Sequence, residues 1–254
     1  MSNIISIINN KGGTGKTTTV LNLGAALAKK KQRVLMVDLD SQCNLTSAFG
    51  ADGTEQGVGE LLTGKATINS VIIANGQLSL IPANEKLLDY EFLLNNEPGR
   101  EYMLREQLEK VADDFDFILI DCPPSLGTLS TNSLVAANHF IVPMQAENFA
   151  FIGLDRIMLI SEKVKKRMNP SLDLGGILFV KLAPRTKFSQ AVIQSLTDNQ
   201  NFAGKIFNTY IRQDISLMES GAFKQNVFDY APKSRGAHDY SDLAKEILKL
   251  YGKK

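Results

Sequence analysis

Lys11-Gly-Gly-Thr-Gly-Lys-Thr-Thr18 is the stretch that decides how this chain folds. It follows an apolar run over residues 4–8 and opens a segment with helical periodicity, which is the strand, glycine loop, helix order of a phosphate-binding loop. Gly12, Gly13 and Gly15 allow the positive φ that turns backbone N–H groups towards an anion at the start of the helix. We therefore expect a polyphosphate at this loop.

The side chains of the loop have separate expected roles. Lys16 is predicted to reach the β- and γ-phosphates, Thr17 to hold a Mg²⁺ ion, and Thr18 to contact the α-phosphate. The residues expected to contact the nucleotide are Lys11, Gly12, Gly13, Thr14, Gly15, Lys16, Thr17 and Thr18. The alternative, a glycine turn with two solvated lysines, is disfavoured because both the strand and the helix are present.

The start of the loop departs from the common pattern G-x-x-x-x-G-K-[ST]. Asn10 stands at the first glycine position, and Lys11 follows it. Two lysines at the mouth of one loop repel each other unless a triphosphate lies between them. The other solution is that Lys11 points away, towards phosphates bound by another chain. Both alternatives remain open on the residues alone.

Two other apolar runs end in carboxylates. Residues 33–37 predict a buried strand that ends in Asp38-Leu39-Asp40, and residues 115–120 predict one that ends in Asp121. In open α/β folds, ligands bind at the carboxyl ends of the strands. Because side chains two residues apart on an extended chain point the same way, we expect both Asp38 and Asp40 to face the phosphate site.

Each of these acids has an expected role. Asp40 is the candidate for placing the attacking water or organising the Mg²⁺ shell, and Asp38 is expected nearer the metal. Asp121 is expected to hold the Mg²⁺ through water, as a lone strand-end aspartate does in phosphate-loop NTPases. The alternative for all three is a polar strand end without chemistry.

The rest of the chain alternates between strand and helix patterns. Further strands are predicted at 78–82, 139–143, 174–181 and 205–211, and helices from about residue 16 to the lysines at 29–31 and over 85–94, 99–112, 128–138, 149–168, 187–199 and 236–251, with short helices and loops over 44–75. This pattern predicts an α/β fold with a mostly parallel twisted sheet of about seven to eight strands and helices on both faces. We expect a single domain over residues 1–254, since 44% of the residues are hydrophobic.

Composition argues against several classes of protein. No apolar run approaches the length of a membrane span, and the N-terminus enters a strand without a leader, so we expect a cytoplasmic protein. Cys43 and Cys122 form no C-x-x-C pair and are interpreted as packing residues. His139 lacks a companion histidine and is expected to cap or pack rather than to bind a metal.

The charge is unevenly distributed along the chain. Residues 1–127 carry 11 Lys+Arg against 16 Asp+Glu, and residues 128–254 carry 17 against 11, although the whole chain has a net charge of only +1. A basic C-terminal half is compatible with an acidic partner such as nucleic acid. It is equally compatible with ordinary surface charge.

These motifs together resemble those of the ParA/Soj partition ATPases, which belong to the deviant Walker-A class that also contains MinD. The resemblance covers nearly the whole chain and rests on the loop at 11–17, Val-Asp-Leu-Asp-Ser-Gln at 37–42, Leu-Ile-Asp-Cys-Pro-Pro-Ser-Leu-Gly at 119–127 and Tyr-Ala-Pro-Lys-Ser-Arg-Gly-Ala-His-Asp-Tyr at 230–240. It implies an ATPase that uses ATP and Mg²⁺ and closes face to face as a homodimer on ATP.

The resemblance also implies roles for single residues. Lys11 would reach the partner's phosphates, Asp40 would support hydrolysis, and Asp121 would serve the Mg²⁺. Lys11, Lys16 and Asp40 are thus the expected catalytic residues. The adenine pocket is expected near Lys181 and at Ile211 and Arg212.

The family binds DNA without sequence preference as the ATP dimer, and a ParB-type or other adaptor protein stimulates hydrolysis. A cytoplasmic, nucleoid-associated protein is therefore implied. One of two family arginines used for DNA contact matches Arg185, but Ser216 stands at the other position. Since phosphate contact needs charge more than a fixed residue, the expected DNA-contacting residues are Arg185, Lys187, Arg212, Lys224, Lys233 and Arg235. The chain begins at its first strand, so we expect no N-terminal helix-turn-helix domain.

Two competing functions use the same fold. A MinD-like membrane switch needs a basic amphipathic segment after the last core helix, where this chain has only residues 252–254. The apolar stripe of the helix over 236–251 is expected to cover the sheet rather than to meet a membrane. An iron–sulfur reductase would need Cys43 and Cys122, which lie in segments already assigned to the nucleotide.

Overall fold

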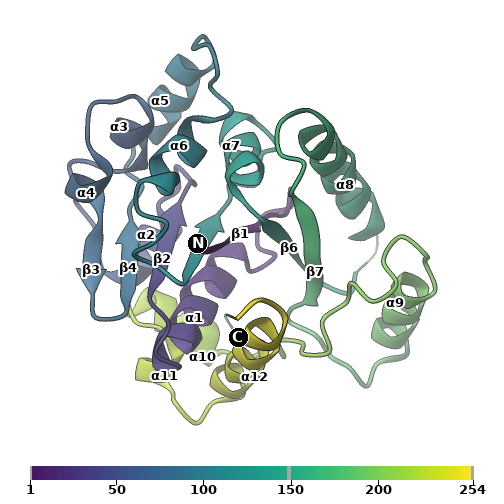
Figure 1. The fold of residues 1–254 in the computed structure, drawn as a ribbon. Helices are drawn as coiled ribbons and strands as arrows, with labels where there is room; N and C mark the ends of the chain where they lie inside the picture. Colours follow the sequence, from purple (N-terminus) through teal and green to yellow (C-terminus); the bar gives the residue numbers. More distant parts are fainter. Residues whose placement is uncertain (1, 148–149, 253–254) are drawn as a thin grey trace.

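A computed structural model describes residues 2–147 and 150–252 of the chain. Within these residues, seven strands form one sheet of order β3-β4-β2-β5-β1-β6-β7. All neighbouring strands run parallel except β3 and β4. Helices lie on both faces of the sheet (Figure 1). The predicted α/β fold with a mostly parallel sheet is confirmed.

The strands are β1 (Asn3–Ile7), β2 (Val34–Asp38), β3 (Ile73–Asn75), β4 (Leu78–Ile81), β5 (Phe117–Asp121), β6 (His139–Met144) and β7 (Asp173–Phe179). The longer helices are α1 (Lys16–Lys29), α5 (Leu87–Leu94), α6 (Met103–Glu109), α7 (Thr128–Ala136), α8 (Ala150–Arg167), α9 (Lys187–Thr197) and α12 (Arg235–Tyr251). The short helices are α2 (Asn44–Phe49), α3 (Val58–Leu62), α4 (Ile68–Val71), α10 (Ser216–Ala222) and α11 (Val227–Tyr230).

The central strands are buried because helices cover both faces of the sheet. Every residue of β2 and β5 is buried, as expected of parallel strands between two layers of helices. β1 lies between β5 and β6, and its register pairs Ile7 with Asp121, while β2 pairs Asp38 with the same residue. The strand ends that carry the predicted acids therefore meet at the carboxyl edge of the sheet, next to the loop that follows β1.

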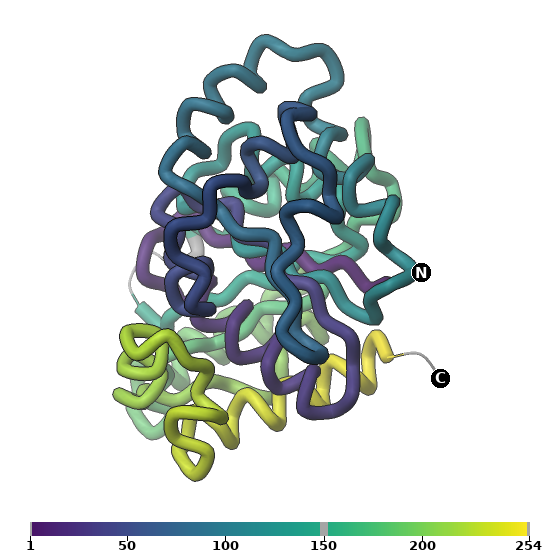
Figure 2. The backbone as a smooth tube through the Cα atoms, turned by 90° about the vertical axis from the view of Figure 1, so that its left-hand side faces the viewer, coloured from purple at the N-terminus to yellow at the C-terminus, as the bar shows by residue number. Residues whose placement is uncertain are grey.

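The last helix, α12, packs on one face of the sheet beside α1. Leu243, Ala244 and Ile247, which belong to its apolar stripe, have no exposed surface. Figure 2 shows the yellow C-terminal segment running alongside the purple N-terminal segments. The stripe thus covers the core, as the sequence indicated. Nowhere in residues 2–147 and 150–252 is a helix both long enough and apolar enough to cross a membrane.

The prediction of a strand over residues 205–211 is wrong. This segment forms only single bridges, between Ile177 and Ile206 and between Leu182 and Arg212. The backbone N–H groups of Asn208 and Thr209 donate to the carboxylate of Glu246, each at 2.9 Å. Phe207 and Ile211 on either side donate to carbonyls of β7, so α12 interrupts the pairing between them and no continuous ladder forms.

The strand β3 was not predicted. It pairs antiparallel with β4 across Gly76, whose φ of 62° suits a tight hairpin. The two turn residues are Gly76 and Gln77, and a glycine at the first of the two positions is the sequence signal for such a turn. The run over residues 73–75 does not by itself predict a strand, because it is short and two of its three residues are exposed.

Candidate functional site

The loop between β1 and α1 has the backbone of an anion site. Gly13 and Gly15 have φ of 73° and 79°, in the left-handed region that favours glycine. A Cβ atom on Gly13 would meet no atom within 4 Å, so the backbone angle, rather than space, requires glycine there. Helix α1 begins at Lys16 and directs the positive end of its dipole towards the loop.

Side chains from other strands hold the loop in this shape. Asn9 donates its side-chain amide to the Pro143 carbonyl at 2.7 Å and accepts the Lys11 N–H at 3.0 Å. The Gly13 carbonyl accepts from Lys181 Nζ at 2.9 Å and from Gln145 Nε2 at 3.0 Å. The loop is therefore preorganised, and Gln145, which sequence reasoning missed, is part of its support.

The two lysines of the loop lie in different surroundings. Lys16 is buried, with 7% of its surface exposed, and its Nζ donates to the Lys11 carbonyl at 3.3 Å. Lys11 has an exposed side chain, and its Nζ lies 2.5 Å from Glu147 Oε1. The ammonium group of Lys11 is thus paired with a carboxylate from the segment that follows β6. Glu147 follows β6 at the carboxyl edge of the sheet, where the predicted acids also lie. The rule that ligands bind at the carboxyl ends of parallel strands therefore also indicates Glu147.

Asp121 is the most unusual acid at this edge. It is fully buried, and neither of its carboxylate oxygens has a hydrogen-bond partner among the described residues. Burial and the negative charge of the neighbouring Asp38 raise the pKa of Asp121 well above its usual range. The Thr17 hydroxyl and the Lys16 ammonium act in the opposite direction but do not outweigh them. A buried carboxylate without a partner, beside a threonine hydroxyl, is a donor set that suits Mg²⁺.

The two acids after β2 have different partners. Asp38 accepts from the hydroxyl and the N–H of Thr46 at 2.7 and 2.9 Å, and burial raises its pKa to about 6. Asp40 accepts the Gln42 N–H at 3.0 Å and lines the cavity next to the loop. The carboxylate of Asp38 thus holds α2, and the expectation that Asp38 lies nearer the metal than Asp40 stays a prediction.

The loop opens into a cavity of two adjoining parts, one suited to the phosphates of a nucleotide and the other to its base. The larger part, about 600 Å³, is lined by residues that include Lys16, Thr17, Thr18 and Asp40. An adjoining pocket of about 130 Å³ is lined mainly by apolar side chains, namely Val180, Ile211, Leu217, Met218 and the Tyr240 ring. Gly15, Thr18 and Lys181 border both parts, so the cavity as a whole fits a nucleotide.

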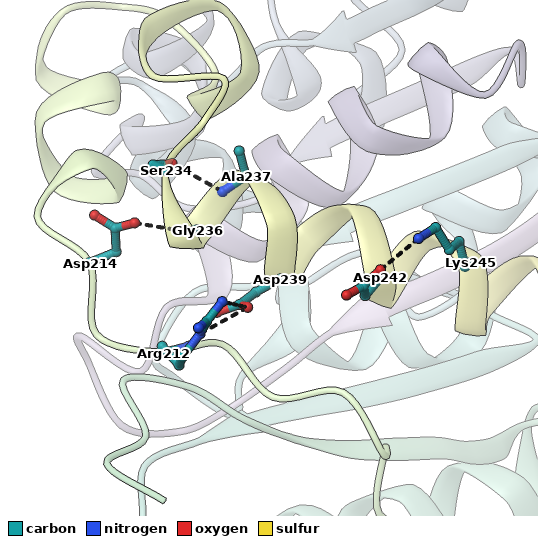
Figure 3. A network of polar contacts seen from close by, with 8 residues as sticks. All are labelled: Arg212, Asp214, Ser234, Gly236, Ala237, Asp239, Asp242 and Lys245. Carbon is teal, nitrogen blue, oxygen red and sulfur yellow. Dashed lines mark hydrogen bonds and ion pairs between the residues drawn. The ribbon is translucent and has the colours of Figure 1, made fainter.

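The basic residues predicted to contact DNA differ in their partners and in their exposure, and two of them form ion pairs within the chain. Arg212 donates from Nε and Nη2 to Asp239 of α12 at 2.6 to 3.1 Å (Figure 3). Lys224 lies 2.7 Å from the Asp52 carboxylate. The exposed members of the set are Arg185, Lys187, Lys224, Lys233 and Arg235. The guanidinium of Arg212 is thus engaged within the chain, although the residue borders both the base pocket and a surface cavity that Arg185 and Arg235 also line.

The cysteines and His139 pack within the fold. Cys122 is fully buried, donates to the Ser133 hydroxyl at 3.0 Å, and has its pKa raised to about 11 by burial. Cys43 is half-buried and precedes α2. The His139 ring lies against Tyr251, with ring centroids 4.2 Å apart.

Comparison with known proteins gives the family. A sequence-family profile described as an AAA domain matches residues 2–174. The chain is 40% identical to the chromosome-partitioning ATPase Soj of Treponema pallidum, with both chains covered completely. It is 39% identical to the sporulation initiation inhibitor protein Soj of Bacillus subtilis, over 97% of this chain and 98% of that protein.

A solved structure of similar fold contains a nucleotide and magnesium. Cobyrinic acid a,c-diamide synthase from Mycobacterium smegmatis, with bound ADP and magnesium, is 34% identical, covers 100% of this chain and 98% of its own, and superposes with a TM-score of 0.86. The same protein has also been solved with an ATP analogue and magnesium. These ligands match the predicted cofactors, ATP and Mg²⁺. From its motifs and its full-length relatives, the chain belongs to the ParA/Soj family of partition ATPases.

Proposed function

We propose that this protein is an ATPase switch for partitioning DNA or another cargo, acting as one domain over residues 1–254. It dimerises on binding Mg·ATP, binds DNA without sequence preference as the dimer, and hydrolyses ATP when a ParB-type or other adaptor protein stimulates it. The observation that carries the proposal is the buried Asp121 beside Thr17 and Lys16, whose carboxylate oxygens have no hydrogen-bond partner among residues 2–147 and 150–252. The exposed Lys11 stands on the same loop as Thr17 and Lys16.

The ATPase step uses Lys16, Thr17 and Asp40, which line the cavity, and Asp121, which is buried beside Thr17. Lys16 and the N–H groups at the start of α1 would bind the β- and γ-phosphates, and Thr17 and Asp121 would hold the Mg²⁺. The bound Mg²⁺ supplies charge neutralisation on these phosphates. Asp40 lines the same cavity and is the acid that orients the attacking water.

The dimer step assigns Lys11 to a second subunit. Its contact with Glu147 joins two partly exposed side chains, 57% and 33% exposed. Exposed ion pairs of this kind contribute about 0–1 kcal/mol, so a triphosphate with several negative charges competes well for the lysine. Lys11 therefore exchanges Glu147 for the partner's phosphates when two ATP-bound subunits meet.

The DNA step assigns phosphate contact to exposed basic residues after β7. Arg185, Lys187, Lys233 and Arg235 are exposed, and Arg185 and Arg235 line one surface cavity. Two such surfaces in a dimer neutralise several phosphates, which places the protein on the nucleoid. The membrane-switch alternative is not favoured because the apolar stripe of α12 is buried.

The test is DNA retention and oligomeric state in the same samples. Sedimentation with and without DNA is measured in a non-hydrolysable ATP analogue, ADP or no nucleotide, over a salt series. We expect dimers and DNA binding only with the analogue, and an affinity that falls with salt with a log–log slope of about −0.9 per phosphate contacted. Liposomes in a parallel sample test the membrane alternative.

Two variants separate the steps. Lys11→Ala should still bind nucleotide but neither dimerise nor bind DNA. Arg185→Glu should dimerise normally and bind DNA more weakly, and Glu162→Lys on the exposed face of α8 serves as a charge-changing control. DNA binding without nucleotide, or an undiminished dimer in Lys11→Ala, would overturn the proposal.

A further inference from the structure

The outer face of α5 exposes three large apolar side chains. Leu88, Phe92 and Leu93 have 63%, 72% and 48% of their surface exposed. Leu88 and Phe92 are four residues apart on the helix and therefore neighbours, and Leu93 extends the patch to one side. Single exposed apolar residues are ordinary, but a continuous apolar patch marks an interaction surface.

The helix that carries this patch is firmly attached to the protein. Leu87, Tyr90 and Leu94 are buried on its inner side. The Tyr90 ring packs so closely on Gly59 of α3 that a Cβ there would overlap the ring. The exposed face is thus a fixed platform, which lowers the entropic cost of binding a partner. In Figure 1, α5 lies at the top of the molecule, away from α10, α11 and α12.

The surroundings of the patch are acidic. Glu85 and Asp89 are exposed and stand three residues before and one after Leu88, and Glu97 is exposed just beyond the helix. Lys86 is the basic residue among residues 84–98, which also contain Glu91. The exposed side of α5 is therefore apolar in the centre and has acidic neighbours along the chain. Two basic side chains reach the helix from other segments, but Lys65 lies over the ring of Tyr90 on the inner side and Arg100 donates to the Asn95 carbonyl at the C-terminal end.

We propose that α5 is a docking surface for a basic amphipathic helix of another protein. Such a helix offers apolar side chains at i, i+3, i+4 and i+7 to Leu88 and Phe92, and lysines or arginines to Glu85 and Asp89. A second copy of this chain fits less well, because twofold pairing of α5 with itself opposes the acidic edges of both copies. Docking on α5 does not require the nucleotide cavity and is independent of the proposed function.

The chain provides its own control surface. Helix α8 also exposes apolar side chains, Ile152 at 52% and Leu159 at 58%, but their exposed neighbours are of mixed charge, with Asp155 and Glu162 beside Arg156 and Lys163. A probe that responds only to exposed apolar area binds both helices. A probe that also needs a net negative edge binds α5 more tightly than α8, where acidic and basic neighbours balance.

The experiment measures binding of two fluorescent fourteen-residue peptides by anisotropy, without nucleotide. One peptide carries leucines on one helical face and lysines elsewhere, and in the other every lysine is replaced by glutamate. We expect the lysine peptide to bind and the glutamate peptide not to bind. Phe92→Ser should lower the affinity for the lysine peptide by about tenfold or more, as loss of a central aromatic anchor does. Leu159→Ser on α8 should leave it unchanged.

Charge reversal and self-association complete the test. Asp89→Lys should weaken binding of the lysine peptide and leave the thermal unfolding temperature unchanged, since its side chain is exposed. Equal affinity of wild type and Phe92→Ser would overturn the proposal, as would tight binding of the glutamate peptide. Loss of a wild-type oligomer in Phe92→Ser would show that a second copy is the occupant, and would also overturn it.

Discussion

The phosphate loop and the basic residues after β7 hold their charges in opposite ways. At the loop, Lys16 and Asp121 are buried at the meeting point of three parallel strands and a helix N-terminus. After β7, Arg185 and Lys187 are exposed, and Arg212 is bound to Asp239. A local sequence motif can therefore determine the position of the charged groups in a buried site. Which charges of a surface patch are free to bind a ligand depends instead on the residues, distant in sequence, that pair with them.

This difference sets the expected size of mutational effects. Charges in a buried site act on the ligand through a medium with little water, so each one is worth much. Exposed charges are screened by salt and act additively, so each one is worth little. The two regions should therefore respond very differently to removal of one basic residue.

The largest effect is expected for Lys16→Ala. It removes the charged donor at the centre of the phosphate cavity, which we expect to lower ATP affinity by about 100-fold, as the loss of charge-assisted hydrogen bonds to two phosphates implies. Isothermal titration calorimetry with Mg·ATP measures the change. Lys163→Ala, on the exposed face of α8, is the matched control. ATP affinity close to that of wild type in Lys16→Ala would remove the distinction between the two regions.

A smaller set of changes is expected for the two acids after β2. Asp40→Ala should lower the stimulated hydrolysis rate by about 100-fold or more while Mg·ATP still binds, since it removes the group that orients water. Asp38→Ala should instead lower the free energy of unfolding by about 1–3 kcal/mol, because it leaves the buried N–H and hydroxyl of Thr46 at the start of α2 without their acceptor. Phosphate release and urea denaturation are measured on both variants. Wild-type turnover in Asp40→Ala would assign the water to another residue.

The smallest effect concerns two arginines of the basic region. Arg212→Ala should lower the free energy of unfolding by about 1–2 kcal/mol, because it leaves the largely buried Asp239 carboxylate without its charged partner. Arg185→Ala should leave stability unchanged, because its side chain is exposed. Urea denaturation compares the two variants. Equal stabilities would mean that the ion pair to α12 contributes nothing and that Arg212 is available to a ligand.

Much of the fold followed from local patterns. The apolar runs that became β1, β2 and β5 are short and continuous, as buried parallel strands are, and each is followed by a polar or glycine-rich turn at the same edge of the sheet. The segment over 205–211 misled because its apolar residues resemble those of a strand. Its pairing with β7 is interrupted at Asn208 and Thr209, whose N–H groups donate to Glu246, a residue that lies far along the chain and cannot be identified from the segment itself.

The amino-acid sequence by itself determined the phosphate loop, the acids at the strand ends and the alternation of strands and helices, because glycine conformation and hydrophobic periodicity act over a few residues. Only the tertiary structure decided which partner each charged side chain takes. It pairs Lys11 with Glu147, Asp38 with Thr46 and Arg212 with Asp239. Within the described part of the chain, it leaves the carboxylate oxygens of Asp121 without a hydrogen-bond partner. The physical reason is that an ion pair or a buried hydrogen bond depends on distance in space, which packing of distant segments sets and local pattern does not.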